Sequence, residues 1–118
     1  FEEALKKNKF TLINFFASWC APCRTEHKYL INLSNKNKEF KILGISFKDK
    51  KKNSINFLNE LGNPYNFVAE DADGKASISF GIYGIPESIL VNNELVIIKK
   101  IVGPIDQKYY EEILQLIQ

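Results

Sequence analysis

The chain has 118 residues, which suffices for one domain with its own core but not for two. It is 45% hydrophobic, as expected for a compact domain of mixed helices and strands, and its net charge of +2 is too small to indicate a nucleic-acid or anionic-membrane partner. No segment reaches the ~20 apolar residues of a membrane-spanning helix, and none resembles a signal peptide. We therefore predict a single domain over residues 1–118 with no nucleic-acid partner.

The first half of the chain alternates predicted strands and helices. Residues 11–17 form a short apolar run typical of a strand buried on both faces. Pro22 fits the first turn of a helix, where its missing N–H costs nothing, and this helix is expected to extend to about residue 35. Residues 40–47 predict a second buried strand. A further helix, capped by Asn53 or Ser54, should end at Gly62. The apolar face expected for it consists of Ile55, Leu58 and Leu61.

The second half predicts shorter elements. Residues 67–69 suggest a strand, followed by a turn and a weakly helical stretch up to Phe80. Residues 87–91 and 95–102 predict a hairpin, and Asp106 can cap a last helix. Alternating strands and helices imply parallel strands, whereas the hairpin adds antiparallel ones. The predicted fold class is therefore α/β, with a mixed central sheet and helices on both faces.

The two cysteines, Cys20 and Cys23, lie at the junction of the first predicted strand and helix. A structural disulfide would close only a four-residue ring, for which loop closure gives ~2 kcal/mol, against ~3–4.7 kcal/mol for rings of 15 to 100 residues. Structural zinc needs four ligands, but the chain has two Cys and a single His, His27, so carboxylates would have to complete the site. We predict no metal and no cofactor, and favour thiol-disulfide chemistry.

A thiol at a helix N-terminus faces unpaired backbone N–H groups, which favour the thiolate. We therefore expect Cys20 to be the exposed nucleophile and Cys23, one turn inside the helix, to be the buried resolving thiol. Attack by Cys20 on a partner disulfide would give a mixed disulfide, which Cys23 would then resolve. The intervening Ala21 and Pro22 add no charge, which weakly favours a reductant over a strong oxidant.

Several segments resemble known proteins. Residues 15–27 are similar to the active-site run of membrane-anchored bacterial thioredoxin-like proteins of the TlpA/ResA kind. The segments that resemble the CcmG/DsbE family in particular are 61–65, 71–74, 81–87 (Gly-Ile-Tyr-Gly-Ile-Pro-Glu) and 102–104. The resemblance covers about residues 11–104 and implies a thioredoxin fold, with an extra insertion around residues 50–62.

This resemblance also implies a function and a location. Such a protein is a periplasmic domain on an N-terminal membrane anchor, which here would lie outside the chain. It reduces the CxxCH disulfides of apocytochrome c, directly or through a cytochrome c maturation subunit. A membrane thiol-transfer protein supplies its electrons. It binds no haem, and its redox group is the Cys20–Cys23 disulfide. We expect a monomer.

The resemblance assigns further site residues. Pro86 matches the cis-proline beside the CxxC motif, although an ordinary trans turn remains the alternative. Ile85 would offer its backbone N–H and C=O to an extended partner chain. Asn14 stands where ordinary thioredoxins carry a buried, proton-relaying Asp. The proton-handling carboxylate must then be another residue, and Glu26 and Glu87 are the candidates. The alternatives are an exposed helix Glu and an edge-strand Glu.

Other residues near the motif have two interpretations each. Trp19 either shields the motif and, with Pro22, contacts the partner, or belongs to the core. Arg24 either favours the thiolate or is a solvated helix residue. His27, a surface or hydrogen-bonded helix residue, is given no role. The surface of residues 50–62, together with Asn63, Pro64 and Tyr65, is expected to help select the partner.

Three other functions stay open. The nearest is a general extracytoplasmic disulfide reductase of the TlpA/ResA kind. A peroxidase on the same fold is disfavoured because no peroxidatic Cys in a Pro/Thr-containing loop stands out. A copper-binding assembly chaperone, from a different class, resembles proteins with CxxxC and a distant His, whereas this chain has CxxC and the nearby His27.

Overall fold

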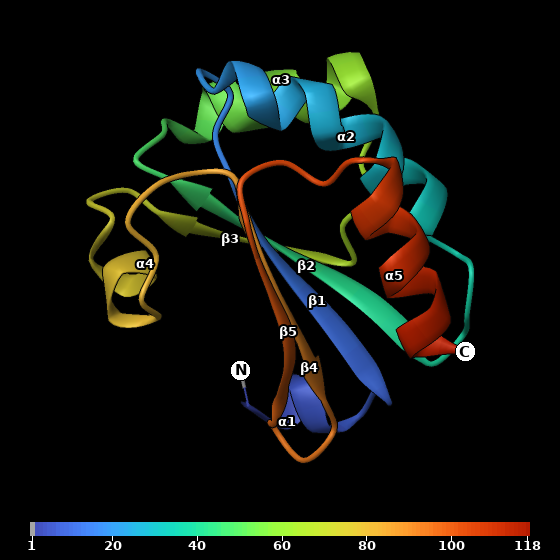
Figure 1. Ribbon diagram of the computed structural model, residues 1–118. Coiled ribbons are helices and arrows are strands. Elements are labelled where there is room, and N and C mark those ends of the chain that lie inside the picture. The colour runs from blue at the N-terminus through green and yellow to red at the C-terminus, as the bar shows by residue number, and fades with distance from the viewer. Residues whose placement is uncertain (1) are drawn as a thin grey trace.

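The computed structural model describes residues 2–118, which form five helices and five strands (Figure 1). In chain order the elements are α1 (Glu2–Lys6), β1 (Phe10–Phe16), α2 (Ala21–Leu33), β2 (Phe40–Phe47), α3 (Lys51–Leu61), β3 (Phe67–Asp71), α4 (Lys75–Ser79), β4 (Glu87–Asn92), β5 (Ile97–Val102) and α5 (Gln107–Ile117).

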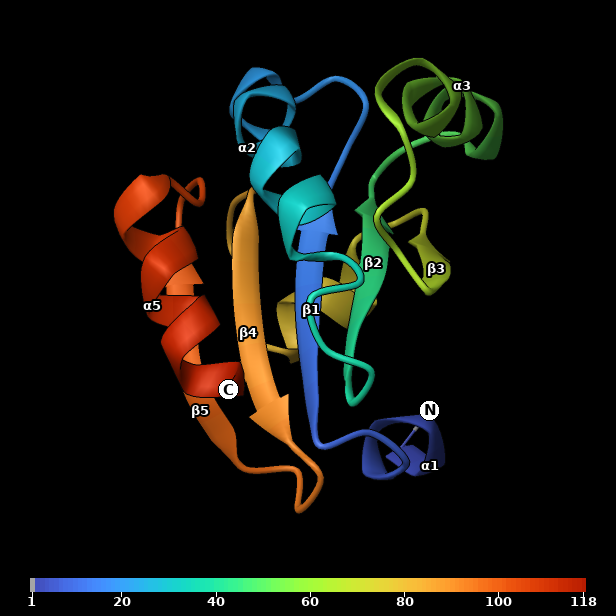
Figure 2. The ribbon, with the colours of Figure 1, turned by 90° about the vertical axis from the view of Figure 1, so that its right-hand side faces the viewer.

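The strands form one sheet in the order β3-β2-β1-β4-β5. The first three are parallel to one another, whereas β4 runs antiparallel to both β1 and β5. Figure 2 shows α2 and α5 on one side of the sheet and α4 on the other. The predicted mixed sheet with helices on both faces is therefore confirmed.

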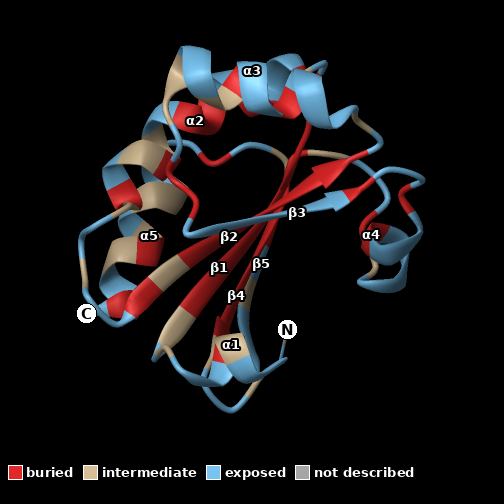
Figure 3. Cartoon of the chain, turned by 180° about the vertical axis from the view of Figure 1, so that it is seen from behind, coloured by how far each residue is buried: buried red, intermediate tan, exposed pale blue. Residues whose placement is uncertain are grey.

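Strand β1 lies in the middle of the sheet and divides its side chains between two cores. Leu12 and Phe16 belong to the core that includes Leu30 of α2 and Ile113 of α5, here called the α2/α5 core. The intervening Ile13 and Phe15 belong to a second core on the other face, with Leu5 of α1. Successive side chains of a strand point to opposite faces, so a strand apolar at nearly every position supplies both cores. Figure 3 shows β1 and β4 as largely buried strands.

Helices α1 and α3 differ from the prediction. The five-residue helix α1 has no predicted counterpart. Helix α3 begins at Lys51, before the expected caps, and its buried residues are Ser54 and Phe57. Ile55 was wrongly expected on the buried face and is 47% exposed. The ring of Phe57 stacks on that of Phe16 at 5.7 Å, and a residue two positions earlier points about 200° away around the helix. Packing of Phe57 therefore turns Ile55 outward.

The expected insertion around residues 50–62 corresponds to α3 and its C-terminal cap, Gly62. Asn63 is exposed after it, but Pro64 and Tyr65 are buried. The expectation that these two residues contribute to a partner-selecting surface is therefore wrong. Tyr65 points into the core because its ring stacks on Phe16, at 4.9 Å between ring centroids. Within residues 2–118, no helix is both long and apolar enough to span a bilayer.

Gly44 of β2 leaves the space that the Tyr65 ring occupies. A Cβ atom on residue 44 would lie 2.8 Å from three carbons of that ring. We expect Gly44→Ala to lower the free energy of unfolding by about 1–3 kcal/mol, the usual cost of overpacking a core. Gly84→Ala is the matched control, since nothing lies within 4 Å of its added Cβ. Urea denaturation of both variants checks this, and equal stabilities would contradict the tight contact.

Candidate active site

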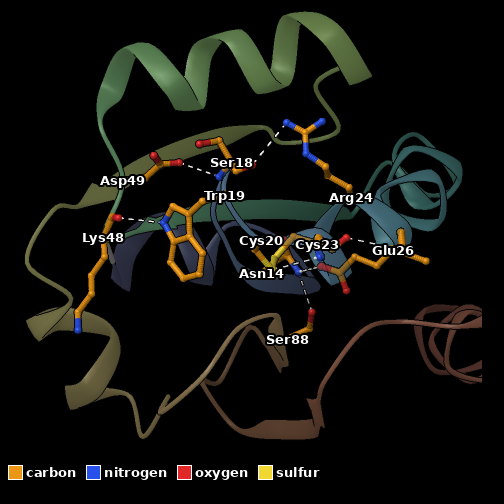
Figure 4. The surroundings of a disulfide bond; sticks show 12 residues. Asn14, Ser18, Trp19, Cys20, Cys23, Arg24, Glu26, Lys48, Asp49 and Ser88 are labelled. Atoms are coloured by element: carbon orange, nitrogen blue, oxygen red, sulfur yellow. Dashed lines mark hydrogen bonds between the residues drawn. A yellow bond between two sulfur atoms is a disulfide. The ribbon is translucent and has the colours of Figure 1, made fainter.

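Cys20 and Cys23 form a disulfide at the N-terminus of α2, with their Cα atoms 5.3 Å apart (Figure 4). Cys20 is the N-cap residue, and its sulfur accepts a hydrogen bond from the backbone N–H of Cys23 at 3.2 Å. Pro22 lies in the first turn of the helix, as predicted. A backbone donor aimed at the Cys20 sulfur stabilises its negative form after reduction, so the helix start favours a Cys20 thiolate.

The expected difference in exposure between the two cysteines is only partly found. Cys23 is buried at 1% exposure, as predicted, but Cys20 is also buried, at 5%. The prediction of an exposed Cys20 is therefore wrong for the disulfide form. The bond to Cys23 and the hydrogen bond from its N–H hold the Cys20 sulfur against the start of the helix. Cys20 remains the more accessible of the two.

Glu26 lies one helical turn after Cys23 and is completely buried. One carboxylate oxygen accepts a hydrogen bond from Asn14 Nδ2 at 2.8 Å, and the other accepts one from the backbone N–H of Ile105 at 3.0 Å. Burial raises the pKa of Glu26 to about 7, although both hydrogen bonds act in the opposite direction. The alternative of an exposed helix Glu is thus wrong. This carboxylate can take up and release a proton near neutrality.

Asn14 holds Glu26 in place through a buried network. Its Nδ2 also donates to Ser88 Oγ at 3.0 Å, and its Oδ1 accepts a hydrogen bond from the Tyr65 hydroxyl at 2.7 Å. Burial raises the pKa of Tyr65 well above its usual range, so the hydroxyl stays protonated and remains a donor. No local signal in the sequence points to Tyr65 or Ser88 at this site, because they lie 51 and 74 positions from Asn14.

Glu87 is also buried, at 5% exposure, but it lies apart from this network. One carboxylate oxygen accepts a hydrogen bond from the N–H of Tyr83 at 3.3 Å, and the other lies 3.6 Å from Lys100 Nζ. Its strand, β4, lies between β1 and β5, so the alternative of an edge-strand Glu is wrong. Of the two candidate carboxylates, the structure links Glu26 to Asn14 and to the helix that carries Cys23.

The Ile85–Pro86 bond is cis, as the resemblance implied. Both residues line an open groove of about 530 Å³ together with Tyr83, Glu87 and Val102. Tyr83 and Val102 are largely exposed, at 85% and 71%. The groove therefore combines exposed apolar side chains with the segment that was expected to receive a partner chain.

Trp19, Arg24 and His27 lie in three different environments. Trp19 is 59% exposed, which rules out the core alternative. Arg24 is exposed, yet it forms an ion pair with Glu60 at 3.4 Å and lies over the Phe57 ring. His27 is buried rather than on the surface, and its Nε2 lies 2.7 Å from the carbonyl oxygen of Gly62. Burial lowers the pKa of His27.

Among residues 2–118, no cluster of three or more His, Cys, Asp or Glu side chains is arranged to hold a metal ion. The cysteine pair with its buried carboxylate is thus the chemically distinctive group of the described residues. When two thiols close a disulfide, they lose two electrons and two protons. A nearby base can accept a proton in this step.

Comparisons with known proteins agree with this site. The Redoxin family model matches residues 2–114. The thiol:disulfide interchange protein CycY of Rhizobium leguminosarum bv. viciae is 50% identical over 102 residues, which are 86% of this chain and 54% of that protein. The thiol:disulfide interchange protein DsbE of Escherichia coli strain K12 is 36% identical over 110 residues, 93% of this chain and 58% of that protein. The chain spans little more than half the length of these curated relatives.

Solved structures give the same result. A crystal structure of a DsbE-type thiol:disulfide interchange protein from Chlorobium tepidum has a TM-score of 0.81 at 26% identity, over 96% of this chain and 80% of that one. A solution structure of a thiol:disulfide interchange protein from Bacteroides sp. has a TM-score of 0.80 at 28% identity, over 95% and 75% of the two chains. The predicted resemblance to DsbE-type proteins and the predicted thioredoxin-like fold are thereby confirmed.

Proposed function

Because this chain belongs to the Redoxin family, we propose that it is a thiol-disulfide oxidoreductase whose reacting groups are Cys20 and Cys23. The observation that carries the proposal is the disulfide at the start of α2 with a buried, ionisable Glu26 on the next helical turn. The names of the relatives, thiol:disulfide interchange proteins, support the same reaction.

In the reducing direction the cycle starts from the dithiol form. The Cys20 thiolate attacks one sulfur of a partner disulfide, forms a mixed disulfide and expels the partner's other sulfur as a thiolate, which takes up a proton. Cys23 then loses its proton and attacks the Cys20 sulfur. This step closes the Cys20–Cys23 bond and releases the partner's second thiolate. The partner gains two electrons and two protons, and a thiol donor restores the enzyme.

Glu26 accepts the proton that Cys23 loses. A carboxylate with a pKa of about 7 is partly ionised near neutrality, so it can take the proton and return it in the next cycle. Glu26 follows Cys23 by three positions, and side chains at this spacing are neighbours on a helix. Figure 4 shows its carboxylate beside the cysteine pair and Asn14.

The partner binds around Trp19, Pro22, Ile85 and Pro86. Trp19 and Pro22 are exposed next to Cys20, and Ile85 and Pro86 line the groove. A partner chain in extended conformation would pair with the backbone of Ile85, as in other cases of strand addition. Trp19 and Pro22 would supply exposed apolar contacts, whereas Ile85 is half-exposed and Pro86 is buried.

In the cell, the protein acts as a reductant in cytochrome c maturation, in the periplasm and tethered to the membrane. It reduces the CxxCH disulfide of apocytochrome c or a maturation subunit, and a membrane thiol-transfer protein reduces it in turn. The string Gly81 to Glu87, which resembles the CcmG/DsbE family, supports this assignment. Most residues of this string also line the groove that contains Ile85 and Pro86.

The reduction potential of the Cys20–Cys23 pair tests the direction of electron flow. A value of about −270 mV, that of thioredoxin, is expected for a reductant, and one of about −120 mV would reverse the proposed direction. Substrate preference is tested with two disulfide peptides of equal length, one with CxxCH and one with CxxCA. Faster reduction of the CxxCH peptide is expected of a maturation protein, whereas equal rates would indicate a general reductase.

A further inference from the structure

The two residues before Cys20 are hydrogen-bonded to the loop between β2 and α3. The backbone N–H of Ser18 donates to Asp49 Oδ2 at 2.7 Å, and the indole N–H of Trp19 donates to the carbonyl oxygen of Lys48 at 3.0 Å (Figure 4). Two successive residues of the active-site segment thus bind two successive residues of a loop about 30 positions later in the chain.

The β2–α3 loop is itself held in place. The N–H of Lys48 donates to the carbonyl oxygen of Asp71 at 2.9 Å, and the other Asp49 oxygen accepts a hydrogen bond from the N–H of Lys50 at 2.9 Å. Lys48 has a φ of 47°, a conformation that residues other than Gly adopt only when their surroundings fix it. Asp49 therefore joins a fixed loop to the segment that precedes Cys20.

The side chain of Trp19 is exposed, but a hydrogen bond holds its indole N–H in place. Its ring is 59% exposed beside Cys20, while its Nε1 is occupied by Lys48. An aromatic ring that is held in one orientation loses little conformational entropy when a partner chain packs against it. A mobile Trp19 would lose that advantage.

We infer that Asp49 is a positioning residue, which holds the Ser18 amide and so keeps the Trp19 ring in the orientation that contacts the partner chain. The inference rests on the proposed oxidoreductase function. Asp49 acts through Ser18 and Trp19 and takes no part in the exchange of sulfurs.

Two substitutions separate this role from a structural one. Asp49→Ala removes both acceptor oxygens, and Asp49→Asn keeps the shape but retains a single acceptor oxygen. We expect Asp49→Ala to raise KM for a disulfide peptide about tenfold at nearly constant kcat, equivalent to ~1.4 kcal/mol of partner binding. The KM of Asp49→Asn should lie between the values for the wild type and Asp49→Ala. Its remaining acceptor oxygen can preserve only part of the three hydrogen bonds that Asp49 accepts, which come from the N–H groups of Ser18 and Lys50 and the hydroxyl of Ser54.

The fluorescence of Trp19 provides an independent readout, since it is the single Trp of the chain. Steady-state anisotropy should fall and quenching by acrylamide should rise in both Asp49 variants. Asp73→Asn is the matched control. Asp73 Oδ1 accepts a hydrogen bond from the N–H of Lys75 at 3.0 Å in the turn before α4 and contacts neither Ser18 nor Trp19. This control should leave KM and Trp19 anisotropy unchanged.

Unchanged KM and unchanged anisotropy in a folded Asp49→Ala protein would overturn the inference. Should that variant not fold, KM and Trp19 anisotropy are measured on Asp49→Asn instead, and unchanged values there would overturn the inference. A wild-type protein that reduces no disulfide peptide would instead refute the proposed function, and the anisotropy of the Asp49 variants would still show whether this residue fixes Trp19.

Discussion

Replacing Cys23 with serine should stop the reaction halfway and leave the enzyme covalently joined to its partner. Cys20 would still attack a partner disulfide, but no second thiol would resolve the mixed disulfide. We expect turnover to fall by about 10³-fold or more, because a whole chemical step is lost. Non-reducing electrophoresis and mass spectrometry of Cys23→Ser with a disulfide peptide should show a one-to-one adduct that a reducing agent releases.

Cys20→Ser is the matched control for this trapping experiment. The remaining thiol, Cys23, is 1% exposed and lies inside the first turn of α2, so it should form no adduct. An adduct in Cys20→Ser but not in Cys23→Ser would reverse the roles assigned to the two cysteines. The result thus tests the assignment even though both cysteines are buried in the disulfide form.

Glu26→Gln should remove a pH dependence of stability. The pKa of Glu26 is about 7 in the folded protein against 4.5 ordinarily, so between these pH values the folded state keeps a proton that the unfolded state has released. The contribution of Glu26 protonation to the free energy of unfolding is therefore fully present below about pH 4.5 and is lost as pH rises through about 7. The loss amounts to roughly 3 kcal/mol.

Urea denaturation at about pH 4.5 and about pH 8 measures this loss in wild type and in Glu26→Gln. His27 has a lowered pKa and contributes the opposite slope, but it is present in both proteins and cancels in their difference. The wild type should lose roughly 3 kcal/mol more than Glu26→Gln over this range. Glu70→Gln, at an exposed position of β3, should behave as wild type. Parallel curves for wild type and Glu26→Gln would contradict the raised pKa.

The same substitution should slow the reaction. Without a base for the Cys23 proton, resolution of the mixed disulfide should be about 10²-fold slower, the lower end of the usual effect of general acid–base catalysis. Single-turnover measurements of mixed-disulfide decay across pH would show this. Wild-type rates should change around pH 7, and Glu26→Gln rates should lack that inflection.

The parts of the molecule that depend on local pattern could be predicted from the sequence. Strand β2 is predicted at residues 40–47, the bounds it has, because a mainly apolar segment suits a buried strand. Asp106 caps α5 as predicted, and its side chain accepts a hydrogen bond from the N–H of Tyr109. Glu26 is a candidate because the resemblance points to it and because it lies one helical turn past Cys23.

The parts that depend on contacts between distant segments could not be predicted. The Tyr65 hydroxyl reaches Asn14 only because the loop after α3 folds over β2, and Asp49 reaches Ser18 only because the β2–α3 loop lies beside the active-site segment. Neither pair has a local sequence signal. The outward position of Ile55 likewise follows from the packing of Phe57 on Phe16 rather than from helix periodicity.

The two cysteines are members of the α2/α5 core, which they share with Leu12 and Phe16, and the core on the other face contains no sulfur. Oxidation and reduction of the cysteines thus change groups that pack in the α2/α5 core and none that pack in the core on the other face. By thermodynamic linkage, a substitution shifts the redox equilibrium only when it stabilises the disulfide form and the dithiol form to different extents. Residues of the α2/α5 core can therefore tune the redox equilibrium without contacting the partner.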